Sequence, residues 1–386
     1  MMSLTTILLV ILVVKCLTLI FVPLVAIRIP RLRPDTYPEV PPEAPEISVI
    51  IPARNEEKNI ARVLSSCLNQ DYERFEVIVV DDHSTDKTPE IIAALATDSE
   101  NLKVVRPPPL PQGWLGKNHA LFHGTLAAEK DHYLFIDADT WLHPLCLKQV
   151  CNHLVSTEAD LLTIIPHVEN KSFWERVVQP CIMKLIMLWF PGNLVNNPKS
   201  KVASANGPFL LFKKESYEHI GGHEALKDDI VEDLSLAKGI KAAGKKIAYV
   251  NAPDLQTIRM YTSLNEIWQG WTKNFYTGLN KNPIIVLLAI IFITLFFIMP
   301  VLLFIYITVA LKGHALNNIL WLLCLFILVV DMVSDHLIEH YYTMKPCPLA
   351  YQFLGYAIII GIILNSMFAS LRGGDVAWKD RQCSIK

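Results

Sequence analysis

The sequence predicts an α/β domain built on a mostly parallel sheet and joined to transmembrane helices at both ends. Strand-like and helix-like segments alternate along residues 46–282. Long apolar segments lie on both sides of this region, in residues 1–27 and 283–371. Alternating strands and helices are typical of a parallel sheet that helices cover on both faces. The chain of 386 residues is long enough for such a domain and several membrane spans.

The composition of the chain excludes several classes of protein. Hydrophobic residues make up 52% of the sequence, so we expect part of the chain to lie in lipid. The net charge of −2 does not favour a polyanion, and we predict no nucleic-acid partner. The eight cysteines lack the spacing of a zinc site or a disulfide framework, which indicates a reducing, cytoplasmic surrounding.

Residues 1–27 are predicted to form an N-terminal transmembrane anchor. The segment from Leu4 to Val25 is almost wholly apolar, apart from Lys15, and is long enough to cross the hydrocarbon core. Three arginines follow within residues 28–33, which places the next domain on the cytoplasmic side. The alternative is a cleaved signal peptide, but no convincing cleavage site follows. Residues 28–45 contain a Pro-rich stretch and are predicted to be a linker.

Residues 283–371 are predicted to form C-terminal transmembrane helices, with a basic tail over residues 372–386. The candidate spans are Ile284 to Leu311, which Pro300 interrupts, Leu316 to Val333, and Leu349 to Ser370. One span before the domain and three after it would place the basic tail outside, so we expect one segment to be miscounted or re-entrant. Asp331 and Asp335 favour the second candidate for that role. The spans have no evident interior charge pairs or repeats, which argues against a transporter.

The elements of the α/β domain follow from hydrophobic periodicity. The first strand covers Ile47 to Ala53, and apolar residues recur at helical spacing from Ile60 to Leu68. The second strand covers Glu76 to Val80, and the next helix is expected to have Thr88 as its cap and Pro89 at its first position. A third strand, a helix and a fourth strand are predicted at Leu102 to Val105, Lys117 to Ala128 and Tyr133 to Ile136.

Charged residues follow three of these strands. The clusters are Arg54-Asn55-Glu56 after the first strand, Asp81-Asp82 after the second, and Asp137-Ala138-Asp139 after the fourth. Ligands of parallel sheets bind at the carboxyl ends of the strands, so we expect the three clusters to converge on one rim. One acidic pair is weak evidence for a site, whereas three clusters at strand ends indicate a ligand.

The types of residue at this rim predict a nucleotide diphosphate. Asp137 and Asp139 flank a small residue, a spacing at which both carboxylates reach one hard divalent cation that stays open to phosphate. Such a cation acts as a Lewis acid on a leaving diphosphate. Asp81 and Asp82 are placed for hydrogen bonds to a base edge or a ribose.

A lysine and a further acidic cluster add to the predicted site. Lys117, beside Asn118 at a helix start, is predicted to bind a phosphate, and the alternative is a solvated surface lysine. Transfer to a hydroxyl group needs a general base, for which a carboxylate is the usual choice. Asp233 precedes a plausible helix and is the predicted base, whereas Asp228 and Asp229 are expected to be loop or capping carboxylates.

Four motifs in this order resemble those of family 2 glycosyltransferases of the GT-A fold, which is Rossmann-like. They are Pro52-Ala53-Arg54-Asn55-Glu56, the segment from Val79 to Asp86, Asp137-Ala138-Asp139, and Glu232-Asp233. The four together are specific, although any one alone is not, and the resemblance covers residues 46–274. The segment from Leu110 to Asn118 and the spans at both ends resemble the branch that includes hopanoid-associated and carotenoid-acid (diaponeurosporenoate) glycosyltransferases.

The resemblance implies roles for these residues. The donor would be a UDP-sugar, with Mg2+ or Mn2+ at Asp139 assisted by Asp137, and with Glu56 and Asp82 on the uracil and ribose. Asp233 would be the base in a single inverting displacement. The substrate-binding residues expected on this basis are Pro52, Arg54, Asn55, Glu56, Asp81, Asp82, Lys117, Asn118, Asp137, Glu232, Trp268, Gln269 and Trp271.

Two departures from the family pattern bear on the product. Processive polysaccharide synthases carry a Gln-x-x-Arg-Trp motif, whereas this chain has Trp268-Gln269-Gly270-Trp271 near the expected place, so processive synthesis is disfavoured. Trp378-Lys379-Asp380-Arg381 has Asp where the family has Gly, which leaves the role of the tail open.

Apolar segments near the predicted site indicate a lipid acceptor met at the membrane surface. Phe173 to Phe190 is short and contains Lys184, so it suits an interfacial or re-entrant segment or, equally, a core helix. Ser263 to Glu266 is a capping-box pattern before an aromatic helix, in which Trp268 and Trp271 anchor the domain or stack on the acceptor. The rival hypotheses are a polyprenyl-phosphate sugar transferase and a membrane sugar-binding or export component with a degenerate transferase domain.

Overall fold

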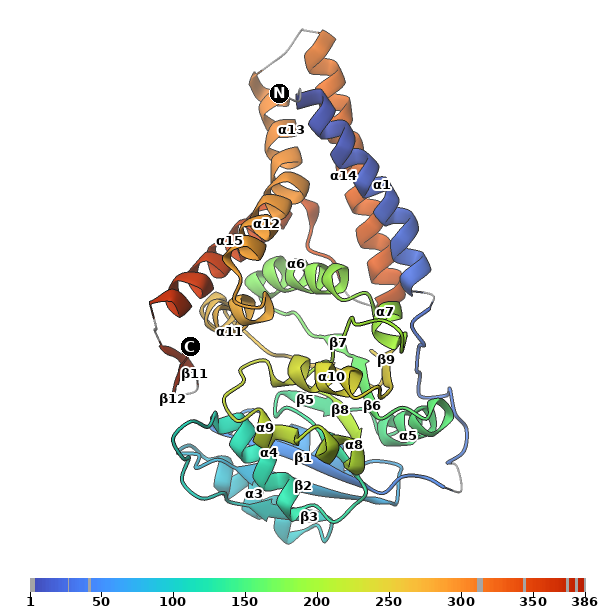
Figure 1. Cartoon of the computed structure of the whole chain (residues 1–386), viewed down its shortest axis with the longest axis vertical. Helices are drawn as coiled ribbons and strands as arrows, with labels where there is room; N and C mark the ends of the chain where they lie inside the picture. The colour runs from blue at the N-terminus through green and yellow to red at the C-terminus, as the bar shows by residue number, and fades with distance from the viewer. Residues whose placement is uncertain are drawn as a thin grey trace.

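The computed structural model describes the backbone of residues 4–26, 28–40, 43–310, 315–342, 345–372, 375–378 and 381–384. Side chains are described for residues 6–17, 28–40, 43–310, 318–342 and 345–372. An α/β domain lies at the bottom of Figure 1, long helices lie at the top, and helix α6 lies between them.

A seven-stranded mixed sheet forms the centre of the α/β domain. Its strand order is β3-β2-β1-β4-β8-β6-β9, and β8 runs antiparallel to both of its neighbours. The strands are β1 (Ile47–Ala53), β2 (Phe75–Asp81), β3 (Leu102–Val105), β4 (His132–Phe135), β6 (Leu161–Ile165), β8 (Leu210–Lys213) and β9 (Ile247–Asn251). All of β2 and nearly all of β1 are buried, as expected for strands covered on both faces. The prediction of a mostly parallel sheet is confirmed.

Helices cover both faces of this sheet and form two cores. Alternate residues of β1 point to opposite faces. Ile47, Val49 and Ile51 therefore pack with α2 (Ile60–Leu68) and α5 (Cys146–Thr157). Ile50 packs on the other side, with α4 (Gly116–Ala127) and α10 (Glu232–Ala242). The remaining helices of this domain are α3 (Thr88–Thr97), α8 (Lys214–His219) and α9 (Gly222–Ala225).

The predicted cap of α3 is wrong. Thr88 is the first residue of the helix, and Lys87 before it makes no side-chain cap bond. The Thr88 hydroxyl instead accepts a hydrogen bond from the Glu56 N–H at 2.8 Å, because the loops after β1 and β2 lie against each other. Asp86 accepts a hydrogen bond from the Thr88 N–H at 2.9 Å and so takes part of the capping role.

A second sheet has three strands, one of which packs against α2 of the α/β domain. Its order is β5-β10-β7, with β5 (Thr140–Leu142), β7 (His167–Val168) and β10 (Gln256–Ile258). The helices near it are α6 (Phe173–Trp189), α7 (Gly192–Asn196) and α11 (Leu264–Gly278). α6 packs against α11 and α15 (Leu349–Leu371), yet Phe173 and Trp189 at its ends are exposed. The buried residues of α6 fit the core helix of the two alternatives, with exposed apolar residues only at its two ends.

The predicted capping box of α11 is half formed. The Ser263 hydroxyl accepts a hydrogen bond from the Glu266 N–H at 3.3 Å, as expected. The Glu266 carboxylate, however, accepts from the Thr262 N–H at 2.7 Å instead of the Ser263 N–H. The helix begins where the sequence predicted.

Three helices of the described chain are long and apolar enough to cross a membrane, and all lie at the C-terminal end. They cover Pro283–Ala310, Asn318–Tyr342 and Leu349–Leu371. The first comprises α12 (Pro283–Ile293), the π-helical segment η1 (Thr294–Ile298) and α13 (Met299–Ala310), so the predicted interruption lies just before Pro300. At the N-terminus α1 (Leu4–Ala26) is helical, and its described apolar part, Thr6–Leu17, is shorter than a span.

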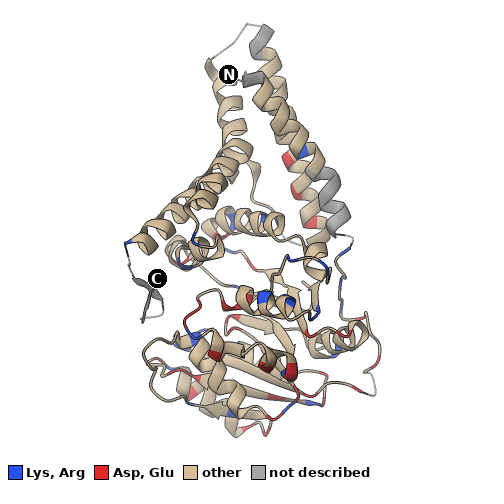
Figure 2. Ribbon diagram, viewed as in Figure 1, with Lys and Arg blue, Asp and Glu red and all other residues tan. Residues whose placement is uncertain are grey.

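The expectation that these spans lack interior charge pairs is wrong. α14 (Ala315–Tyr342) continues well past Asp331 and Asp335, and both carboxylates are buried. Lys15 of α1 pairs with Asp331, and Lys184 of α6 pairs with Asp335 at 2.6 Å. Each partner comes from another helix, so no single span reveals the pairs in its own sequence. Figure 2 shows a few acidic and basic positions on the long helices, which are otherwise mostly uncharged.

The tail of the chain contains a two-stranded ribbon. β11 (Asp375–Trp378) pairs antiparallel with β12 (Arg381–Ser384), and Trp378 lies opposite Arg381. Lys379 and Asp380 of the predicted tail motif lie outside the described residues.

Candidate active site

The three predicted clusters lie at one edge of the sheet. β1 lies between β2 and β4 and is parallel to both, so the carboxyl ends of all three strands point the same way. Ala53 at the end of β1 is the register partner of Asp81 at the end of β2. The turn with Asp137 and Asp139 follows β4 and leads into β5. The convergence predicted from the strand ends is confirmed.

Arg54 and Asn55 join the first two loops of this rim. The Arg54 Nη1 donates hydrogen bonds to the carbonyl oxygens of Asp82 and His83 at 2.6 and 3.1 Å. The Asn55 Oδ1 accepts a hydrogen bond from the Thr85 N–H at 2.8 Å. Asn55 has a φ of 51°, a left-handed conformation that asparagine tolerates better than most residues. Both side chains thus hold the loops after β1 and β2 together.

The acidic residues of these loops are buried. Glu56, Asp81 and Asp82 have exposed fractions of 7%, 5% and 3%. Pro52 lies just inside the rim, in β1 opposite Val80. An isolated acidic pair in a loop is normally exposed to solvent, whereas these carboxylates are buried at the ends of their strands.

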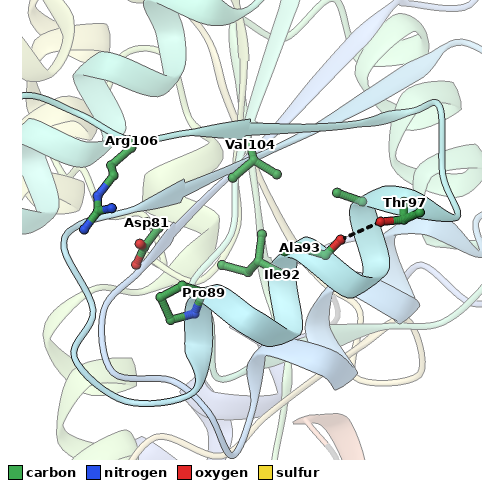
Figure 3. A pocket seen from close by; sticks show the side chains of 8 residues that line it. Asp81, Pro89, Ile92, Ala93, Thr97, Val104 and Arg106 are labelled. Atoms are coloured by element: carbon green, nitrogen blue, oxygen red, sulfur yellow. Dashed lines mark hydrogen bonds between the residues drawn. The ribbon is translucent and has the colours of Figure 1, made fainter.

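A pocket of about 490 Å3 opens beside Asp81, between α3 and the edge strand β3. Its walls are mainly apolar and include Ile92 and Val104 (Figure 3). Asp81 and Arg106 lie together at one end of the pocket. Sequence reasoning missed Arg106, although it follows the third strand as the acidic clusters follow the other three.

Lys117 lies between two acidic residues of the site, Asp137 after β4 and Glu232 at the start of α10. Its Nζ lies 2.8 Å from the Asp137 Oδ1 and 2.8 Å from the Glu232 Oε1. Burial alone would lower the pKa of Lys117, but the Asp137 and Glu232 carboxylates outweigh it, and the pKa is raised well above its ordinary value. The Lys117 side chain is 37% exposed, and its two ion pairs hold its positive charge at the rim.

Asp139 carries a buried oxygen without a hydrogen-bond partner. This atom is the Oδ1, and burial followed by the Asp137 carboxylate raises the pKa of Asp139 to about 7. Among the described residues, no group of three or more His, Cys, Asp or Glu side chains is arranged to hold a metal alone. Two neighbouring carboxylates, one with an unpartnered oxygen, fit a hard cation that takes its remaining ligands from a diphosphate.

Asp233 lies in the first turn of α10, beside Glu232. Its Oδ2 accepts a hydrogen bond from the Gly207 N–H at 3.0 Å, and its Oδ1 accepts from its neighbour's N–H, that of Leu234, at 2.7 Å. A Cβ at position 207 would lie 3.1 Å from the Oδ2, so a glycine allows this close backbone approach. Burial followed by the Glu232 carboxylate raises the pKa of Asp233 to about 7. Such a carboxyl group is suited to accept a proton near neutral pH.

The neighbouring polar residues support the loop before α10. Asp229 accepts hydrogen bonds from the Val231 N–H at 3.0 Å and from the Ser235 hydroxyl at 2.5 Å, so it is a loop carboxylate, one of the two roles predicted for it, while Val231 is the cap of α10. The buried Asn118 amide donates to the carbonyl oxygens of Leu226 and Asp229 at 2.6 and 2.9 Å. Asn118 thus holds this loop against α4.

The aromatic residues of α11 contact α6, α15 and Tyr261. The Trp271 Nε1 donates to the Gln179 Oε1 of α6 at 3.3 Å. Trp268 packs on α15, where a Cβ at position 361 would approach its ring to 2.9 Å. Gln269 is exposed and contacts Asn265 of its own helix. These contacts favour the anchoring role of the two tryptophans over stacking on an acceptor.

The chain is similar to known proteins in sequence and in fold. Residues 48–221 match the family described as Glycosyl transferase family 2. A 4,4'-diaponeurosporenoate glycosyltransferase of Staphylococcus aureus is 29% identical over 236 residues, which cover 60% of this chain and 61% of the relative. The match thus spans less than two thirds of that relative's length.

One solved structure has a similar fold over nearly the whole chain. It is a mannosyltransferase from Pyrobaculum calidifontis in complex with GDP-Man and Mn2+. The TM-score is 0.51 at 17% identity, and the alignment covers 96% of this chain and 99% of that chain. At this identity the likeness supports a GT-A-like fold.

Proposed function

Residues 48–221 of this chain belong to Glycosyl transferase family 2, and from this premise we propose that the protein is an inverting, metal-dependent hexosyltransferase that moves a sugar from a UDP-sugar to a lipid acceptor. The observation that carries the proposal is the position of Lys117 between Asp137 and Glu232. Lys117 brings together Asp137, which is proposed to act on the leaving group, and Glu232, the neighbour of the proposed base, at one rim of the sheet.

The donor lies along this rim in the proposal. Asp81, Asp82 and Glu56 contact the nucleoside, and the pocket with Arg106 takes the base between apolar walls. Asp137 and Asp139 hold a divalent cation, Mg2+ or Mn2+, and Lys117 adds a fixed positive charge for the diphosphate. The cation supplies Lewis-acid stabilisation of the charge that develops on the diphosphate.

Asp233 is the proposed base. It takes the proton of the acceptor hydroxyl while the hydroxyl oxygen forms a bond to the anomeric carbon and the bond from that carbon to the diphosphate oxygen breaks. A single displacement of this kind inverts the anomeric configuration. The Gly207 and Leu234 N–H groups fix the orientation of the carboxylate, so its proton-accepting position is set before the acceptor binds.

Transfer is expected to rise with pH through about 7, because Asp233 must be deprotonated to act and burial beside Glu232 raises its pKa to about 7. Below that pH, kcat/KM should fall about tenfold per pH unit as the base becomes protonated. The profile is measured at saturating Mn2+, since the pKa of Asp139 is also raised to about 7. A flat profile across this range would contradict the assignment of the base.

The membrane arrangement is also part of the proposal. Residues 46–282 form the catalytic domain on the cytoplasmic side, residues 1–27 and 283–371 hold it in the cell membrane, residues 28–45 link it to α1, and residues 372–386 form the tail. The three apolar C-terminal helices support membrane association. The packing of α1 along α14 supports placing α1 among them. A lipid acceptor then reaches the site from the bilayer surface.

The proposal is tested with membranes that contain the full chain. They are incubated with labelled UDP-glucose, UDP-GlcNAc and GDP-mannose, and the extracted lipids are identified by mass spectrometry. A labelled lipid that depends on a UDP-sugar and on Mn2+ is the expected result. Label on a polyprenyl phosphate would instead identify the alternative acceptor, and label found only as free sugar or polymer would reject a lipid acceptor.

A further inference from the structure

An ion pair between a buried glutamate and a partly buried arginine lies next to the turn that carries Asp139. Glu175 is in the first turn of α6 and has no exposed surface. Its carboxylate accepts hydrogen bonds from the Arg259 Nε at 2.9 Å and from the Arg259 Nη2 at 3.2 Å. This two-bond geometry fixes the orientation of both side chains more tightly than a single contact would.

The main chain of Arg259 holds Asp139 directly. The Arg259 N–H donates a hydrogen bond to the Asp139 carbonyl oxygen at 3.2 Å. One residue earlier, Ile258 in β10 is the register partner of Thr140 in β5. Arg259 therefore contacts Glu175 through its side chain and the Asp139 turn through its backbone. The ion pair with Glu175 thus restrains the residue whose main-chain N–H holds the turn.

The position of Glu175 depends on how α6, the helix that carries it, is held in place. Glu175 also closes the capping box with Ser172 at the start of the helix. Further along the same helix, Lys184 pairs with Asp335 of α14 at 2.6 Å. Ion pairs thus hold α6 at two places, one to the Asp139 region and one to a long apolar helix. Removing one partner of a buried pair leaves an uncompensated charge, so the geometry at Glu175 is strongly specified.

We propose that Glu175 and Arg259 are positioning residues that hold the Asp139 main chain where its carboxylate meets the divalent cation and the donor diphosphate. This inference rests on the proposed function of Asp139. In Figure 1, α6 lies between the α/β domain and the long helices. The geometry of the donor site therefore depends on how the α/β domain is seated against these helices.

The test measures Mn2+ binding by the full chain in phospholipid nanodiscs, with UDP or GDP present. Unbound Mn2+ is followed by electron paramagnetic resonance, which needs no catalytic turnover. Glu175→Gln is expected to weaken Mn2+ binding about tenfold, the size of effect seen when a group that orients a metal ligand is removed. Arg259→Lys keeps the charge but loses the two-bond geometry, and it should weaken binding in the same direction.

A double variant tests whether the two residues act through each other. If they do, Glu175→Gln combined with Arg259→Lys should weaken Mn2+ binding no more than the worse of the two single variants. Additive losses would contradict the connection. If thermal unfolding shows that Glu175→Gln does not fold, Mn2+ binding by Arg259→Lys alone tests the proposal.

Glu76→Gln is the matched control. Glu76 is also a buried glutamate with an ion pair, to Lys103 at 2.7 Å, but it lies near the start of β2, away from the rim. It should destabilise the fold without changing Mn2+ binding. Equal losses in Glu76→Gln and Glu175→Gln, or unchanged binding in Glu175→Gln and Arg259→Lys, would overturn the inference. Absence of Mn2+ binding by the wild-type protein with either nucleotide would instead reject the metal site of the proposed function.

Discussion

Replacing Asp233 with asparagine is expected to lower sugar transfer about 10³-fold while leaving donor binding intact. The amide has nearly the same shape as the carboxylate and can still accept the Gly207 N–H, but it cannot take a proton from the acceptor. A positioned general base contributes about 10² to 10⁴ in rate. The change is measured as kcat with labelled donor and extracted lipid, and donor affinity is measured separately by calorimetry.

Asp228→Asn is the control for this variant. Asp228 lies in the same acidic cluster, but its side chain is exposed and has no place in the proposed chemistry, so transfer should be unchanged. Turnover of Asp233→Asn at the wild-type rate would remove Asp233 from the role of base.

Stability provides a second check on Asp233→Asn. The folded-state pKa of Asp233 is raised from 3.8 to about 7, so its contribution to folding is present at low pH and is lost as the pH rises through about 7. At pH 8 the wild-type protein carries a charged carboxylate in a poorly solvated place. Asp233→Asn removes this charge but leaves one of the Gly207 and Leu234 N–H groups facing an amide NH2, so it should unfold close to the wild-type temperature at this pH. A lower unfolding temperature would mean that lost activity reflects lost structure.

Asp139→Asn is expected to lower sugar transfer about 10³-fold and, unlike Asp233→Asn, to remove Mn2+ binding. The Oδ1 of Asp139 is buried without a hydrogen-bond partner, and a neutral amide in its place is a poor ligand for a hard cation. Loss of the cation removes several kcal/mol of stabilisation from the leaving diphosphate. Transfer is measured with labelled donor, and Mn2+ binding by electron paramagnetic resonance in the presence of UDP.

The contrast between the two variants tests the division of roles. Asp233→Asn should bind Mn2+ and UDP normally, whereas Asp139→Asn should not. Asp98→Asn, at the exposed end of α3, serves as a control that should match the wild-type protein in both assays. Normal Mn2+ binding by Asp139→Asn would show that the cation is held elsewhere.

The sequence by itself determined the elements around the rim. β1 and β2 are continuous apolar runs that end in charged residues, and this pattern reports both the burial of a strand and the position of its end. Asp137, Asp139 and Asp233 were therefore predicted as site residues from local pattern and motif. Asp137 and Asp139 lie beside the loops after β1 and β2 because parallel strands have their carboxyl ends at one edge. Asp233 instead comes from the first turn of α10, beside Glu232, which pairs with Lys117.

Only the tertiary structure decided which distant groups become partners. Glu175 and Arg259 are 84 residues apart, and Lys15 and Asp331 are 316 apart. The tertiary structure also decided that β8 lies antiparallel between β4 and β6, and that Arg54 donates its hydrogen bonds to the neighbouring loop. Periodicity and spacing describe neighbours along the chain. The partner of a buried charge, in contrast, is set by the packing of elements that the sequence does not place next to each other.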